Sequence, residues 1–167
     1  MQYYRCISTA LGFCALRTNT GNDNTSVGAN SLRANTTGAY NVALGSAALL
    51  ENTTGIQNIA IGCASLRCNI GGSNNTAVGH QSLFANTASN NTALGFCSLR
   101  SNTTGTLNTA VGYKSLSSNT TGRNNVAFGE GSLRDTTTGS YNTALGAGAL
   151  ISNVVGVNNT AVGRAAL

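Results

Sequence analysis

The sequence predicts an all-β fold, a single-domain parallel β-solenoid of about ten coils with 16 or 17 residues each. The first observation is a tandem repeat, whose fullest copy reads NTAVGYKSLSSNTTGRN and spans residues 108–124. The second is its fixed period: the leading residue recurs every 16 or 17 positions, first as Ser8 and then as Asn24, Asn41, Asn58, Asn75, Asn91, Asn108, Asn125, Asn142 and Asn159. The third is composition, because charged residues make up only 8% of the chain, against about a quarter in ordinary globular domains. A short fixed period is typical of a solenoid, in which each unit packs only against its neighbours.

Each repeat is numbered here from its leading residue, position 1, and positions 2–4 predict a strand. Position 2 carries the β-formers Thr, Val or Ile, position 3 is small, and position 4 is always apolar. Positions 2 and 4 therefore share one face of the strand. Glycine at position 5 predicts a turn, the Ser-Leu pair at positions 8 and 9 predicts a second short strand, and the Asn-Thr-Thr-Gly run predicts the closing turn.

The expected core consists of the apolar residues at position 4 and the leucines at position 9. These are Val27, Leu32, Leu44, Leu49, Ile61, Leu66, Val78, Leu83, Leu94, Leu99, Val111, Leu116, Phe128, Leu133, Leu145, Leu150, Val162 and Leu167. The small residues at positions 3 and 8 indicate close approach of another backbone, either the opposite wall of the coil or a neighbouring chain. Stacking at about 4.8 Å per coil would place the leading asparagines in a ladder of side-chain amides.

The repeats carry glycines at positions 5 and 15. They are expected to supply positive φ angles, which few other residues adopt at low cost. Position 15 is Gly in eight of the nine complete copies, with Ser89 as the exception. The turn glycines at position 5 are Gly28, Gly45, Gly62, Gly79, Gly95, Gly112, Gly129, Gly146 and Gly163.

The repeats divide the chain into residues 1–7, an N-terminal segment that completes a coil, and residues 8–167, a solenoid of ten repeats with a partial last copy. Leu167 falls at position 9, and Met1, counted backwards, falls at position 11. Subunits stacked head to tail would therefore resume the pattern, which predicts an open filament, unless the chain is a fragment of a longer fibre. The apolar stretch before Leu16 fits the repeat better than a signal peptide, and no run is long enough to span a membrane.

Residues suited to catalysis or metal binding do not recur at one place on neighbouring coils. His80 is the single histidine, and Glu51 and Glu130 fall at different repeat positions. General acid–base catalysis needs convergent groups, so we expect no catalytic, metal or cofactor site and no enzyme activity. The five cysteines form no CxxC pair and are expected to be free thiols.

Arginine recurs at position 10 and forms a speculative polyanion stripe of Arg17, Arg33, Arg67, Arg100 and Arg134 on a chain of net charge +5. Such a stripe could bind a surface glycan, or it could be a solvated row that keeps rods apart. We do not expect nucleic acid as a partner, because the stripe is sparse and aromatic residues for base stacking are expected to be missing. Ice binding is disfavoured, because the adjacent threonines of the closing turn point to opposite faces.

The unit resembles the head repeats of trimeric autotransporter adhesins, and more closely the repeats of phage and virus tail-fibre proteins. The triplet Ala110-Val111-Gly112, Ser115 and Gly122 match the conserved Ala-Ile-Gly, Ser and Gly of the adhesin pattern. The resemblance covers residues 8–167. It implies a left-handed parallel β-roll, often trimeric, that displays or extends an adhesive tip.

These observations predict a structural fibre or filament subunit, a rod that self-assembles head to tail. The alternative is a trimeric adhesin or tail-fibre segment that binds a surface receptor or glycan. In both cases the principal partner is another copy of the chain, and the expected location is extracellular, on a virion or on a cell-surface appendage.

Overall fold

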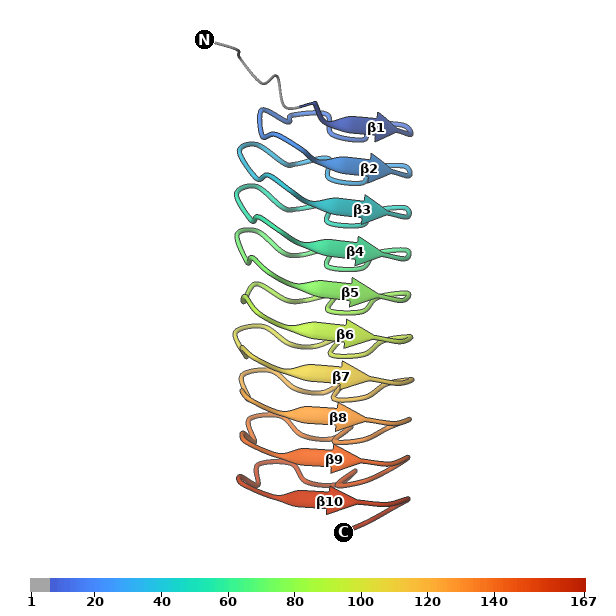
Figure 1. Cartoon of the computed structure of the whole chain (residues 1–167), viewed down its shortest axis with the longest axis vertical. Coiled ribbons are helices and arrows are strands. Elements are labelled where there is room, and N and C mark those ends of the chain that lie inside the picture. Colours follow the sequence, from blue (N-terminus) through green and yellow to red (C-terminus); the bar gives the residue numbers. More distant parts are fainter. Residues whose placement is uncertain (1–6) are drawn as a thin grey trace.

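The computed structural model describes residues 7–167, which form an all-β solenoid without any α-helix in that range (Figure 1). Every coil contributes one three-residue strand at positions 2–4. The strands are β1 (Thr9–Leu11), β2 (Thr25–Val27), β3 (Val42–Leu44), β4 (Ile59–Ile61), β5 (Thr76–Val78), β6 (Thr92–Leu94), β7 (Thr109–Val111), β8 (Val126–Phe128), β9 (Thr143–Leu145) and β10 (Thr160–Val162). The predicted fold class is confirmed, and the expected completion of a coil by residues 1–7 lies almost wholly outside the described residues.

The ten strands form one parallel sheet in sequence order, and each repeat position pairs with the same position of the next coil. Figure 1 shows the result as a straight rod in which the strands are stacked like rungs. The register survives the shorter repeat that begins at Asn75, because Thr76 still pairs with Thr92. In that coil the Asn75 side chain donates to the carbonyl oxygen of Ala88, where other coils use the turn glycine. Ala88, rather than Ser89, therefore takes the place of that glycine, and the missing residue is at position 14.

The interior of each coil is narrow and is filled by one leucine, small residues and asparagine. The position 9 leucines from Leu32 to Leu133 are fully buried, as are most of the position 3 alanines. Ser26 at position 3 and Ser31 at position 8 lie 2.6 Å apart, hydroxyl to hydroxyl, across this interior. The small residues therefore face the opposite wall of their own coil, which is one of the two arrangements that the sequence left open.

The expectation that position 4 belongs to the core is wrong. Leu94 is 45% exposed and Phe128 is 56% exposed, whereas Leu99 in the same coil as Leu94 is 0% exposed. Residues at position 4 are exposed or half-buried throughout the sheet: Val27, Leu44, Ile61, Val78, Leu94, Val111, Phe128, Leu145 and Val162. The alternation was predicted correctly but its direction was not, because Ala at position 3 points inward and positions 2 and 4 therefore point outward. Leu167 at position 9 is also exposed.

Two columns of buried asparagine side chains join the coils. In the position 1 column, Asn108 donates its backbone N–H to Asn91 Oδ1 at 3.0 Å and its Nδ2 to the carbonyl oxygen of Gly122 at 2.8 Å. In the position 12 column, Asn119 Nδ2 donates to Asn102 Oδ1 at 2.7 Å. The predicted amide ladder is therefore present, and a second one runs beside it.

The second column is interrupted twice, and the interruptions leave two buried acceptors without partners. Asn69 Oδ1 and Asn119 Oδ1 are the buried side-chain polar atoms of residues 7–167 that lack a hydrogen bond. After Asn69 comes the shortened coil, in which Asn86 donates to Ala88 instead. After Asn119 comes Thr136, which has no side-chain amide. Its hydroxyl donates to the backbone carbonyl oxygen of Asn153.

Left-handed backbone geometry replaces the second strand expected around positions 8 and 9. Leu99 has φ +48°, and Cys97 two residues earlier has φ +54°, so this wall cannot be extended. Its coils are nevertheless paired, since Leu99 N–H donates to the Ser115 carbonyl oxygen at 3.0 Å.

The two turn glycines serve different purposes. Position 5 glycines have φ between +122° and +137°, as expected. Position 15 glycines do not have positive φ. They are required by close approach, because a Cβ on Gly122 would collide with the carbonyl oxygen of Gly139 in the next coil.

Candidate functional site

The outward face of the sheet is chemically uniform along the rod. Two parallel columns cross all ten strands, one of Thr, Val or Ile at position 2 and one of Val, Leu, Ile or Phe at position 4. Neither column contains a charged residue in any coil. We call this surface the sheet face.

Three coils add apolar residues along one edge of the sheet face, whereas the other full-length coils carry Asn or Gln there. Tyr40, Leu107 and Tyr141, all at position 17, are exposed beside the strands. The two strand columns cover on the order of 400 Å², from about 4.8 Å per coil and about 7 Å between alternate residues. Soluble monomers rarely expose a contiguous apolar patch larger than a few hundred Å². The sheet face is therefore a continuous uncharged surface of the size that the largest apolar patches reach on soluble proteins, and it is the first candidate for a contact with a partner.

The predicted polyanion stripe lies on a different wall, and its members are not equivalent. Arg17, Arg33, Arg100 and Arg134 are exposed, and Arg67 is half-buried. The expectation that the stripe lacks aromatic partners is wrong, since Phe84 occupies position 10 between two of the arginines. The guanidinium carbons of Arg67 and Arg100 lie 5.6 and 5.5 Å from the centre of the Phe84 ring. These distances are typical of cation–π contacts, which fix both arginines over one ring.

A stack of rings that the sequence reasoning missed runs beside the stripe at position 6. The rings of His80 and Phe96 are 5.2 Å apart, and those of Phe96 and Tyr113 are 5.4 Å apart, with interplanar angles near 10°. The sequence could have predicted this stack, because three successive repeats carry a ring at position 6. Lys114 extends along the last of them, with its Nζ 5.2 Å from the Tyr113 centroid.

Arg134 is held in a fixed orientation by the neighbouring Asp135. Its Nε donates to Asp135 Oδ1 at 2.8 Å, and a terminal nitrogen donates to Asp135 Oδ2 at 3.0 Å. These hydrogen bonds hold the pKa of Asp135 below its usual value. The pair is exposed to solvent, so its net contribution to stability is small.

Cys14, Cys63, Cys68 and Cys97 are free thiols, as expected, and Cys6 lies outside the described residues. Burial raises the pKa of both Cys68 and Cys97, which disfavours their thiolate forms. Residues 7–167 contain no group of three or more His, Cys, Asp or Glu side chains arranged to hold a metal ion. The same residues include no helix with the length and hydropathy needed to cross a membrane.

No protein-family model, curated protein or solved structure matches the chain.

Proposed function

We propose that this chain is a structural fibre module whose copies associate side by side through the sheet face. The observation that carries the proposal is the exposed, uncharged pair of columns that crosses every strand of the rod. Association would remove the position 4 side chains from water, which contributes about 25 cal/mol for each Å² of apolar surface buried.

The geometry favours lateral contacts along the rod. The in-register stacking repeats the same side chains at every coil, so one contact would be reproduced along the whole length of two parallel copies. The two columns alone supply about half of the roughly 800 Å² per partner of a standard interface. The resemblance to adhesin head repeats, which are often trimeric, supports an assembly of three copies.

Charged substitutions on the sheet face provide the test. Leu94→Glu combined with Phe128→Glu places two carboxylates in the proposed interface, where burial without partners is costly. We expect the unmodified chain to sediment as a small oligomer and the double variant to sediment as a monomer with an unchanged circular dichroism spectrum.

The matched control carries the same charges in the same two coils but on another wall. Thr104→Glu combined with Thr138→Glu replaces exposed residues at position 14 and should leave the oligomer intact. A monomeric unmodified chain, or an oligomer that survives the sheet-face charges, would refute lateral association. Head-to-tail filaments would appear instead as particles of increasing length in electron micrographs.

The same columns favour a second candidate function, ice binding. Position 2 is Thr in seven of the ten coils, and it alternates with an aliphatic column on a regular, straight sheet. This array is on the strands and not in the closing turns, where the sequence reasoning looked for it. Thermal hysteresis of a monomeric chain, abolished by Thr92→Lys and Thr109→Lys, would support this function over lateral assembly.

A further inference from the structure

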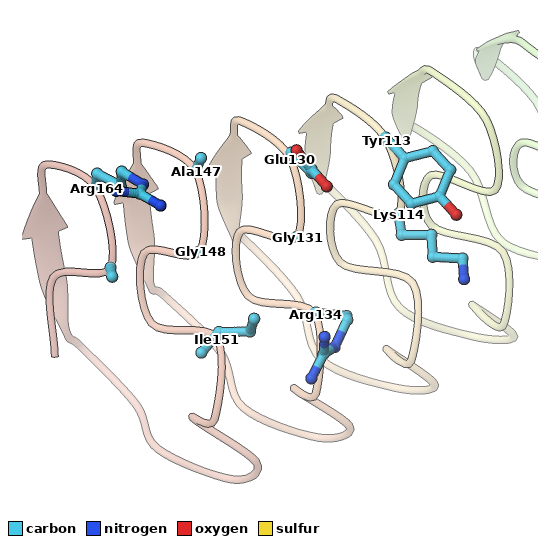
Figure 2. Close-up of a pocket in the computed structure, with 10 residues that line it drawn as sticks. Tyr113, Lys114, Glu130, Gly131, Arg134, Ala147, Gly148, Ile151 and Arg164 are labelled. Carbon is cyan, nitrogen blue, oxygen red and sulfur yellow. The ribbon is translucent and has the colours of Figure 1, made fainter.

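A hollow lies beside the arginine stripe, over the coils that contain β7 to β10 (Figure 2). It has a volume of about 630 Å³, within the 300–1,000 Å³ typical of small-ligand sites. It exists because position 7 is glycine in two successive coils, Gly131 and Gly148, whereas this position carries Lys114 and Gln81 elsewhere. The backbone of these two glycines, which carry no side chains, therefore forms the floor of the hollow.

The walls of the hollow combine one aromatic ring, three cations and one carboxylate. Tyr113, the last ring of the stack, and Lys114 stand at one end, and Arg164 stands at the other. Glu130 rises between them, as Figure 2 shows. Arg134 borders the side, and its contact with Asp135 leaves its remaining N–H groups available to a ligand.

We propose that this hollow binds a carboxylated sugar unit of an acidic oligosaccharide. The apolar face of a pyranose ring would pack against Tyr113, and the sugar carboxylate would accept hydrogen bonds from Lys114 and Arg134. Glu130 would accept hydrogen bonds from the sugar hydroxyls. Arg164, about three coil spacings from Lys114, would meet a second carboxylate of the same chain.

The charge pattern distinguishes an acidic glycan from a nucleic acid. A nucleic-acid strand needs a continuous positive groove and several stacking rings. Here Glu130 stands within the hollow and would repel a phosphate beside it, whereas it can accept hydrogen bonds from the hydroxyls that an acidic sugar carries beside its carboxylate. A neutral sugar would offer no carboxylate to Lys114 or Arg164.

Larger residues in place of the two floor glycines would fill the hollow and test the proposal without disturbing the coil. Position 7 accepts larger residues in the left-handed conformation, since Gln81 has φ +53°. A Cβ at Gly131 would lie 3.7 Å from Ile151 Cδ1, and one at Gly148 would lie 3.9 Å from Ala165 Cα, which are ordinary contacts. The test variant is therefore Gly131→Gln combined with Gly148→Gln, and the matched control is Ala64→Gln at the same repeat position in another coil.

Binding is measured by calorimetry with an oligogalacturonate, with a neutral oligosaccharide of the same length and with a single-stranded oligonucleotide of the same charge. We expect the unmodified chain and Ala64→Gln to bind the oligogalacturonate with the same Kd, which rises with salt, and the filled variant to bind about tenfold more weakly or not at all. Equal binding of the neutral sugar, tighter binding of the oligonucleotide, or full binding by the filled variant would overturn the proposal.

This site does not depend on the sheet face. The monomeric Leu94→Glu/Phe128→Glu variant should bind the oligogalacturonate as the unmodified chain does. Loss of lateral assembly and loss of sugar binding are thus separately observable.

Discussion

Two rows of large apolar residues run the length of the rod, and they have opposite environments. The position 9 row points into the coil, where Leu49 is 0% exposed, whereas the position 4 row points outward, where Leu44 of the same coil is 45% exposed. The interior takes only one large side chain per coil, because alanine and asparagine occupy the rest of it. The difference indicates that the inner row stabilises each coil and that the outer row is available to a partner.

The largest expected effect separates the two rows within one coil. Leu49→Ala removes a fully buried side chain and should cost about 2–5 kcal/mol, which lowers the melting temperature by about 5–15 °C. Alanine itself tolerates the left-handed geometry, as Ala47 and Ala64 do. Leu44→Ala should cost far less in a monomeric background. Equal shifts in thermal denaturation followed by circular dichroism would show that the two rows are not distinct.

A somewhat smaller effect is expected from the polar part of the inner wall. Asn108→Ala removes the amide that donates to Gly122 and the oxygen that accepts from Asn125, so several buried groups lose their partners. We expect a loss of about 2–4 kcal/mol. The measurement is the midpoint of thermal unfolding, with exposed Thr121→Ala in the same coil as the control. A shift no larger than that of the control would contradict the role of the ladder.

The smallest expected effect is a gain in stability. Thr136→Asn restores the missing rung of the position 12 column and offers an amide to the unpartnered Asn119 Oδ1. We expect about 1 kcal/mol of stabilisation, or an increase of about 2–4 °C in melting temperature. The gain should disappear in an Asn119→Ala background, which removes the acceptor. A gain of equal size in that background would assign the effect to another cause.

The repeat predicted the fold, the coil length and the position 1 ladder, because one in-register stack satisfies the same pattern in every copy. It did not reveal which side of the strand faces inward. Val-Ala-Leu in β3 alternates in size, and large apolar residues are ordinarily the buried ones. Here the narrow coil reverses that rule, and Ala43 is the buried residue.

The features beside the arginine stripe could be predicted from the sequence only in part. The rings at His80, Phe96 and Tyr113 are visible when the repeats are aligned, but their stacking depends on every coil keeping the same register. Phe84 replaces arginine at position 10, which looks like a gap in the stripe and is in fact the ring between two cations. The hollow follows from two glycines at position 7, whose significance requires knowledge of the side chains around them.

The in-register stacking also has a mechanical consequence. Successive coils are joined by backbone hydrogen bonds and asparagine amides that bridge one coil to the next, so a pull along the rod loads these contacts coil by coil. One released 17-residue coil would lengthen the chain by about 50 Å, from about 4.8 Å when stacked to nearly 60 Å when extended. We expect a rod built in this way to be stiff under small loads and to lengthen in equal steps under large ones.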